Sequence, residues 1–305
     1  MKRFVISALV FALLSMATIA ISVFVLPDRQ MAGSMLGMEK AKLERLRTTG
    51  EGRIILIGGS NIGHGFDSGV LAQATGKTVV NMGLHAGLGL VYHLKSVQDS
   101  LKPGDLAVIL PEYDMFDGES LYGGDELLAM VTAIVPEHRK LLTFRHWLHL
   151  AGSIPGYGAR KFKRFKKLFK KPRPCQDYNE YGDNQEWRTT EAATRKFHAT
   201  TRRGPEAWRG DDALEAINGF KSVAESVGAT MVVMPPVFAD TAYGNWEGYI
   251  REIESRLERN GTPFAVPPGR YRLDDALFLD TDYHLNREGV TERMVRLVED
   301  IAKWR

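Results

Sequence analysis

The stretch Ile54-Ile-Leu-Ile-Gly-Gly-Ser-Asn-Ile-Gly-His-Gly65 joins four aliphatic residues to a glycine-rich turn that carries a serine. A continuous aliphatic run predicts a strand buried on both faces, as strands of parallel sheets are. Glycine lets the chain turn sharply where the strand ends, which leaves the Ser60 hydroxyl exposed at the carboxyl edge of the sheet. Ser60 is therefore a candidate nucleophile; the alternative is an ordinary loop with a capping serine.

Similar apolar runs recur along the chain and alternate with segments of helical periodicity. The expected strands cover residues 53–58, 78–82, 106–110, 230–234 and 264–266, and the expected helices cover 89–100, 213–226 and 246–259. Apolar strands separated by helices are typical of a mostly parallel sheet with helices on both faces. We therefore predict an α/β fold whose ligands bind at the carboxyl ends of the strands.

An uncharged apolar stretch runs from Phe4 to Pro27, directly after Lys2 and Arg3. At about 1.5 Å per residue, a helix of this length crosses a bilayer core of about 30 Å. A cleavable signal normally has a shorter apolar core followed by small residues, whereas bulky residues close this stretch. We expect residues 1–27 to form an uncleaved signal anchor, with the rest of the chain outside the cytoplasm by the positive-inside rule.

The remainder divides into a linker over residues 28–50, with a short helix over 38–47, and one α/β domain over 51–305. An irregular insertion spans about 114–210 and carries a basic amphipathic segment, 159–173. This segment suits contact with anionic lipid head groups or an acidic polysaccharide, and the alternative is a solvated basic face packed on the domain. The anchor disfavours a nucleic-acid partner.

The amino-acid composition excludes some kinds of cross-link and metal site. The formal charge of +3 demands no polyanionic partner, and the single cysteine, Cys175, excludes an intramolecular disulfide and a cysteine-based zinc cluster. The eight histidines show no metal-ligand spacing. We expect neither a metal nor a cofactor.

Two further segments carry polar groups of catalytic type. Val79-Val-Asn-Met-Gly83 ends a strand in Asn-x-Gly, where small residues let backbone N–H groups approach a substrate oxygen, although an ordinary glycine-rich turn has the same pattern. Near the other end of the chain, His284 follows Asp280 and Asp282 and precedes Asn286, which is suited to cap the last helix. A nearby acid fixes the tautomer of a histidine that takes a serine proton.

The order of the serine turn, the Asn-x-Gly turn and the acid-histidine loop resembles the SGNH (GDSL-like) hydrolase superfamily, over residues 53–304. The resemblance implies a three-layer, flavodoxin-like fold, with Ser60 as nucleophile, His284 as base and the N–H groups of Ser60 and Gly83 as oxyanion donors. The family usually has Gly-Asp-Ser in the first block. The Gly-Gly-Ser-Asn of this chain is similar to the membrane-anchored branch associated with bacterial surface-glycan acylation.

The acid and the third block depart from the family pattern. The family's acid usually lies three residues before the histidine, at Thr281 here, so the resemblance of the loop favours Asp280 and leaves Asp282 open. The family's third block supplies an asparagine amide to the oxyanion hole, where this chain has Glu112 and Tyr113. Loss of one such donor costs about 2.7 to 4 kcal/mol of transition-state stabilisation.

The remaining candidates are Asn61 and Asn81, which we count with Gly83, Glu112 and Tyr113 as groups for the oxyanion or the substrate. His64 and His85 lie near the same edge, as supporting or structural residues.

The predicted function is an envelope-located serine acyl-transfer enzyme, an O-acetyltransferase or an esterase, which acts on a surface or exported polysaccharide through a Ser60 acyl-enzyme. It would be a single-pass protein of the inner (cytoplasmic) membrane with its domain on the periplasmic side. One alternative is a non-catalytic glycan-binding or assembly accessory protein with a degenerate site, and another is a lipid-directed esterase. Transferase and esterase share the intermediate, so the sequence does not separate them.

Overall fold

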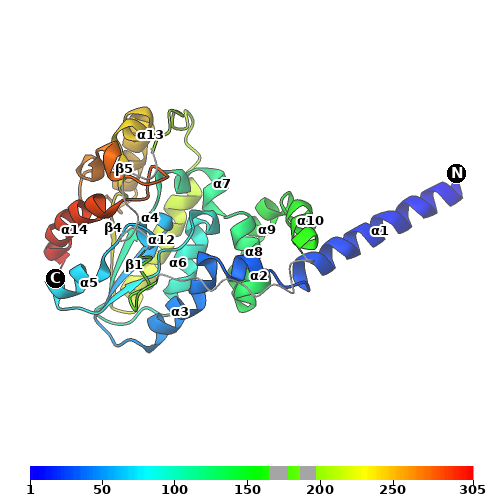
Figure 1. Cartoon of the computed structure of the whole chain (residues 1–305), viewed down its shortest axis with the longest axis horizontal. Helices are drawn as coiled ribbons and strands as arrows, with labels where there is room; N and C mark the ends of the chain where they lie inside the picture. Colours follow the sequence, from blue (N-terminus) through cyan, green and yellow to red (C-terminus); the bar gives the residue numbers. More distant parts are fainter. Residues whose placement is uncertain (165–177, 186–196, 305) are drawn as a thin grey trace.

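The centre of the molecule is a parallel sheet of four strands in the order β2-β1-β3-β4 (Figure 1). The computed structural model describes residues 1–164, 178–185 and 197–304. The strands are β1 (Ile54–Gly58), β2 (Val79–Asn81), β3 (Leu106–Leu110) and β4 (Thr230–Val233), and a separate parallel pair joins β5 (Phe238–Ala239) to β6 (Arg272–Leu273). The first three strands are completely buried, as their aliphatic runs predict.

The fifth predicted strand, 264–266, is reduced to a single bridge between Phe264 and Val233. Pro263 and Pro267 flank the segment. Since proline has no N–H to donate to a neighbouring strand, a longer ladder does not form here.

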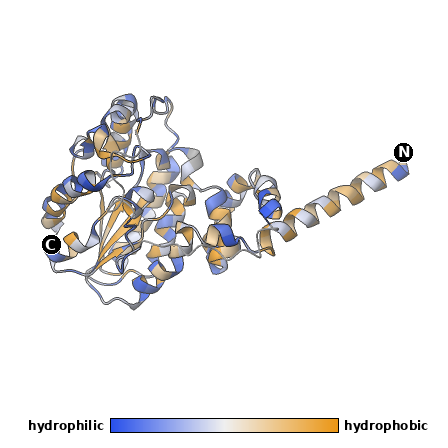
Figure 2. Cartoon of the chain, in the orientation of Figure 1, coloured by the Kyte–Doolittle hydropathy of each residue, from blue (hydrophilic) through white to orange (hydrophobic). Residues whose placement is uncertain are grey.

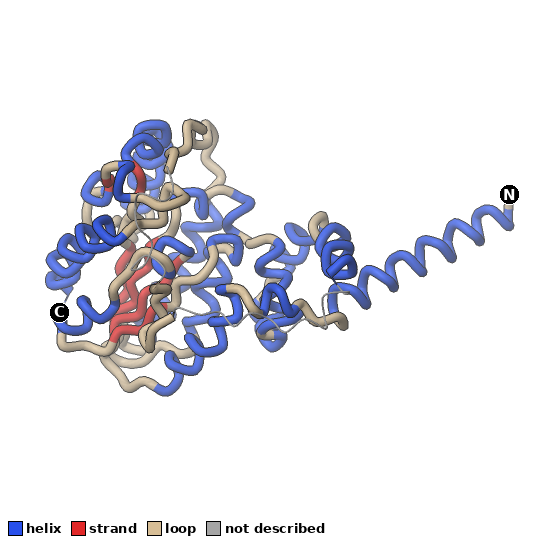
Figure 3. Tube along the Cα trace, viewed as in Figure 1, coloured by secondary structure: helices blue, strands red, loops and turns tan. Residues whose placement is uncertain are grey.

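Helices cover both sides of the sheet, with α6 and α12 packed together on one side and α5 and α14 on the other (Figure 3). The helices are α1 (Lys2–Phe24), α2 (Arg29–Ala32), α3 (Glu39–Thr48), α4 (Ser60–Gly63), α5 (Ser68–Thr75), α6 (Leu90–Gln98), α7 (Gly118–Leu121), α8 (Asp125–Ala129), α9 (Phe144–Ala151), α10 (Ile154–Arg164), α12 (Asp211–Ser226), α13 (Asp240–Arg259) and α14 (Arg287–Ile301). The α/β prediction is confirmed.

The strand register brings three turns to one edge of the sheet. Gly58 pairs with Leu110, and Leu56 pairs with Asn81. Because all the strands are parallel, the residues that follow β1, β2 and β3 meet at the carboxyl edge. The chain also crosses from one side of β1 to the other between β2 and β3, and such a crossover opens a crevice at this edge.

The segment over 28–50 is part of the folded domain rather than a free spacer. Leu43 and Leu46 of α3 are buried in the core, and the Lys42 ammonium donates to the Asn81 carbonyl over 2.9 Å. The guanidinium of Arg53 is fully buried against Asp105 and also donates to the Leu46 carbonyl. The hydrogen bond from Arg53 to the Leu46 carbonyl joins α3 to the amino-terminal end of the sheet.

Helix α1 extends away from the domain and is hydrophobic along its length (Figure 2). It is long and apolar enough to cross a membrane. Its last turn, however, is built into the protein: Ser22 Oγ donates to the Gly158 carbonyl over 2.6 Å, and Lys161 Nζ donates to the Val23 carbonyl over 2.6 Å. Gly158 allows this contact, since a Cβ there would lie 3.1 Å from the Val23 side chain.

The predicted insertion consists mainly of short helices between β3 and α12, including α7 to α10. Helix α10 contains residues 159–164 of the predicted basic segment, and residues 165–173 lie outside the described ranges. Figure 1 shows α9 and α10 beside the domain end of α1. The basic residues of α10 therefore lie where α1 leaves the domain.

Candidate active site

Ser60 is the first residue of α4, directly after the two glycines that follow the apolar part of β1. The backbone of β3 leaves no space for a side chain at Gly58, where a Cβ would lie 2.6 Å from the Leu110 carbonyl oxygen, and a Cβ on Gly59 would displace the Glu112 side chain, whose Oε1 would be 2.5 Å away. Within the described residues, no hydrogen bond from the Ser60 N–H is found. A backbone donor at the start of a short helix turn therefore remains available beside the Ser60 hydroxyl.

The side chain of Glu112 is buried and contacts both Ser60 and Asn61. Its Oε1 accepts hydrogen bonds from Ser60 Oγ at 3.3 Å, from Asn61 N–H at 3.0 Å and from Asn61 Nδ2 at 3.2 Å. In this structure the Ser60 hydroxyl thus donates to a carboxyl group.

Asn61 joins Glu112 to a buried arginine on the last helix. Arg293 NH1 donates to the Asn61 carbonyl at 2.5 Å and to the Gly65 carbonyl at 3.1 Å, and NH2 approaches Asn61 Oδ1 at 3.4 Å. Burial lowers the pKa of Arg293 to about 10, which leaves it charged at neutral pH. The expected contact of Asn61 with substrate is not supported, because its amide holds the nucleophile turn together.

Sequence reasoning missed Arg293. The available signal was a charged residue within the apolar face of α14, next to Met294 and three residues after Val290. A buried guanidinium requires several acceptors, and here the carbonyls of the nucleophile turn provide them.

His284 is hydrogen bonded to Asp280, with 2.8 Å between Nδ1 and Oδ1. The tight turn that pairs them is closed by bonds from Leu279 N–H to the His284 carbonyl at 2.9 Å and from His284 N–H to Thr281 Oγ1 at 3.1 Å. Asp282 instead accepts from the Thr200 N–H at 2.9 Å, and burial raises its pKa. Of the two candidate acids, Asp280 is the one that orients the imidazole.

The other ring nitrogen of His284, Nε2, is shielded from solvent and has no hydrogen-bond partner within the described residues. The ring stacks on His64, with 4.7 Å between centroids and 26° between planes. His64 follows α4, and its N–H donates to the Ser60 carbonyl at 2.8 Å. His284 therefore lies against the short helix that Ser60 begins, although no hydrogen bond joins the two side chains.

Burial, followed by the neighbouring His284, lowers the pKa of His64 to about 3. His64 is therefore neutral at physiological pH and adds no positive charge against an imidazolium at position 284. His85 has a local role, since its Nδ1 accepts from the Gly87 N–H at 3.0 Å. The two histidines are supporting residues.

The Asn-x-Gly turn is internally bonded. Asn81 Oδ1 accepts from the Gly83 N–H at 2.8 Å, and Asn81 Nδ2 donates to Asp183 at 2.7 Å and to the Ile62 carbonyl at 3.2 Å. Both ends of the Asn81 amide are occupied, so a direct contact with substrate is not supported. The Gly83 N–H, expected to bind an oxyanion, has a partner within the protein.

Tyr113 has packing and backbone contacts rather than a contact of its hydroxyl. Its hydroxyl is buried without a hydrogen-bond partner among the described residues, and burial raises its pKa. Its N–H donates to the Tyr283 hydroxyl at 3.0 Å, and the rings of Tyr113 and Tyr283 both pack on Phe238. Tyr113 joins the histidine loop to the end of β3, and the expected contact of Tyr113 with the oxyanion or the substrate is not supported.

The described part of the chain contains no group of three or more side chains arranged to hold a metal ion. No protein-family model matches the chain. A search of curated proteins finds no relative either. The interpretation of this site therefore rests on the geometry of its own residues.

The hydrogen bonds of Asp280 and Asp282 predict different effects when each is replaced by asparagine. Asp280→Asn should lower the rate of p-nitrophenyl acetate hydrolysis by about 100-fold or more, because the amide favours the wrong tautomer of His284. Asp282→Asn is the matched control and should change the rate by less than about threefold, since an amide oxygen still accepts from Thr200 N–H. Equal losses in the two variants would contradict the assignment.

Proposed function

We propose that the protein is a membrane-anchored acyl-transfer enzyme of SGNH type, with Ser60 as nucleophile, His284 as base and Asp280 as the acid that orients the base. The observation that carries this proposal is the Asp280–His284 pair, whose ring has an unpartnered Nε2 among the described residues and stacks on His64, directly after the helix that begins with Ser60. The strand order β2-β1-β3-β4 agrees with a flavodoxin-like fold, which supports the same interpretation.

Reaction requires the Ser60 hydroxyl to turn from Glu112 towards His284. His284 Nε2 then accepts the hydroxyl proton while Oγ attacks the carbonyl carbon of the acyl donor, and the Ser60 N–H binds the oxyanion. Collapse of the tetrahedral intermediate breaks the bond to the leaving alkoxide, which takes the proton from His284. Water or a sugar hydroxyl attacks the acyl-enzyme in the second half-reaction, again with His284 as base.

The positions of α1 and α10 favour a substrate at the outer face of the inner membrane. Helix α1 is suited to span the bilayer, and α10, which carries the exposed Lys163, packs beside its domain end. Such residues are attracted to anionic lipid head groups. We assign the substrate to a surface or exported polysaccharide, which carries many hydroxyl groups for acyl transfer.

Acyl transfer is tested with the full-length protein in detergent micelles, p-nitrophenyl esters of increasing chain length as donors and oligosaccharides as acceptors. We expect Ser60-dependent release of nitrophenol with the acetyl ester, and acetylated oligosaccharide detected by mass spectrometry. Ser60→Ala should reduce both to background, whereas Ser222→Ala, at an exposed serine of α12, should not. Activity that survives Ser60→Ala would refute the proposal, and a preference for long chains would favour a lipid-directed esterase.

A second candidate, a non-catalytic glycan-binding or assembly protein, is favoured by one observation. Glu112 holds the Ser60 hydroxyl and supplies no amide to an oxyanion. A carboxyl oxygen that accepts the Ser60 hydrogen bond offers no N–H donor to the developing negative charge.

Glu112→Gln separates the two candidates. The variant keeps an oxygen for Asn61 and adds an N–H donor, so an active site should acylate about tenfold faster or more. Stopped-flow release of nitrophenol measures this rate, with Glu247→Gln on the surface of α13 as control. If wild type and Glu112→Gln both match Ser60→Ala, the non-catalytic candidate is correct.

The packing of α1 predicts that the anchor is retained. Cleavage near residue 27 would remove Ser22 and Val23 and leave the Gly158 carbonyl and the Lys161 ammonium without these partners, which is costly for buried groups. The intact mass of protein extracted from bacterial membranes should include the whole of α1. A mature chain that begins near residue 28 would show that α1 is a cleaved signal.

A further inference from the structure

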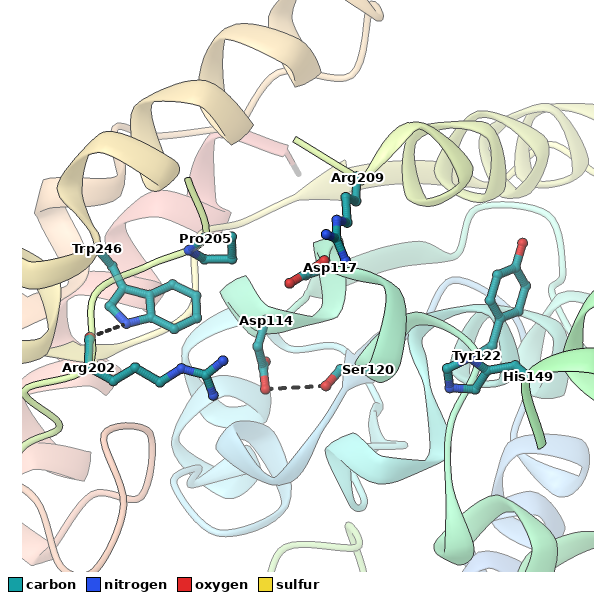
Figure 4. Close-up of a pocket in the computed structure, with 9 residues that line it drawn as sticks. All are labelled: Asp114, Asp117, Ser120, Tyr122, His149, Arg202, Pro205, Arg209 and Trp246. Atoms are coloured by element: carbon teal, nitrogen blue, oxygen red, sulfur yellow. Dashed lines mark hydrogen bonds between the residues drawn. The ribbon is translucent and has the colours of Figure 1, made fainter. Parts of the chain in front are cut away.

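A cavity of about 610 Å³ lies at the turn that follows β3, where Asp114, Asp117 and Ser120 line it (Figure 4). One lining residue, Asp114, belongs to the 3₁₀ helix η3 (Tyr113–Phe116), which starts directly after Glu112. Asp114, which lines the cavity, follows Glu112 by two residues in the chain, and Glu112 accepts the hydrogen bond of the Ser60 hydroxyl. On another side it reaches His149 of α9, one of the helices near the domain end of α1. Its volume suits a small-molecule ligand.

Two arginines with unpaired guanidinium groups face this cavity. Arg202 and Arg209 are exposed, and their side chains form no ion pair within the described residues, whereas Arg145 and Arg256 on the neighbouring surface are paired with acids. A guanidinium presents several N–H donors in one plane and matches the two oxygens of a carboxylate or a phosphate.

The acids in the cavity only partly offset this positive charge. Asp114 and Asp117 both line it. Burial, followed by the charge of Glu112, raises the pKa of Asp114 to about 7, so its carboxyl group is only partly ionised at neutral pH. Among the described residues that line the cavity, positive charge is therefore in excess, and the partly protonated Asp114 is able to exchange hydrogen bonds with hydroxyl groups.

Trp246 provides the flat apolar surface of the cavity. Its Nε1 donates to the Arg202 carbonyl at 3.0 Å, and the indole packs edge-on against Phe238 and Tyr249. These contacts fix the ring next to the Arg202 side chain, as Figure 4 shows. An aromatic ring suits the apolar C–H face of a pyranose, while the polar groups around it suit the hydroxyls.

We propose that this cavity binds an anionic sugar, with the carboxylate or phosphate held by Arg202 and Arg209 and the pyranose ring against Trp246. Within the proposed function, on which this role rests, the cavity is the site of the acyl acceptor: it holds the sugar at the edge where the Ser60 acyl-enzyme forms. Binding itself needs neither Ser60 nor His284.

Binding is measured by isothermal titration calorimetry with the full-length Ser60→Ala variant in lipid nanodiscs, which prevents turnover. The probes are digalacturonic acid for a carboxylate, glucose 1-phosphate for a phosphate and maltose as the neutral comparison. We expect at least one anionic probe to bind about tenfold more tightly than maltose. Binding of the carboxylate or the phosphate probe alone identifies the source of the anion.

Substitutions locate the binding site. The double variant Arg202→Gln/Arg209→Gln should raise the Kd of the anionic probe about tenfold or more. The control Arg203→Gln, at an exposed arginine outside the cavity, should change this Kd by less than about twofold. All three positions are on the surface, and an unchanged melting temperature confirms folding. No binding of either anionic probe, equal binding of maltose, or an equal loss in Arg203→Gln overturns the inference.

These outcomes are independent of the catalytic proposal. An unreactive Ser60 in a protein that still binds an anionic sugar refutes the enzyme and leaves this site intact. Acyl transfer by a protein that binds neither anionic probe refutes the site alone.

Discussion

The close approach of the ends of β1 and β3 is the constraint on which the candidate site depends. The two strands pair in parallel as far as Gly58 and Leu110, and at Gly58 the Leu110 backbone leaves no space for a side chain, while a side chain at Gly59 would displace that of Glu112. This contact brings Ser60 next to Glu112 and leaves the serine at the carboxyl edge, where a crossover in the sheet opens a crevice. A larger residue at either glycine would separate the nucleophile turn from the turn after β3.

The histidine loop reaches this edge from a distant part of the sequence, and buried polar contacts hold it there. Arg293 of α14 donates to the carbonyls of the nucleophile turn, the Tyr283 hydroxyl accepts from the backbone after β3, and His64 stacks on His284. Each of these contacts is costly to break in the interior, because it would leave a polar group unpaired or a ring unpacked. Together they fix the His284 imidazole relative to Ser60.

Local patterns predicted the strands, the main helices and the Asn286 cap of α14, because aliphatic runs and capping residues act over a few positions. They also indicated the candidates Ser60 and His284. They did not separate Asp280 from Asp282, since both spacings allow a contact within one loop. The partners of Asn61, Asn81 and Glu112 lie far away in the sequence, so local patterns do not predict them. The strand predicted around Phe264 is reduced to one bridge, because prolines flank it.

The central claim is that His284 activates Ser60, and covalent labelling tests it most directly. Full-length protein is treated with a serine-directed fluorophosphonate, and peptides from wild type and His284→Ala are compared by mass spectrometry. We expect an adduct on Ser60 in the wild type that is lost or strongly reduced in His284→Ala, with no adduct on the exposed Ser222. An unlabelled Ser60 in folded wild-type protein, or equal labelling without His284, would contradict the claim.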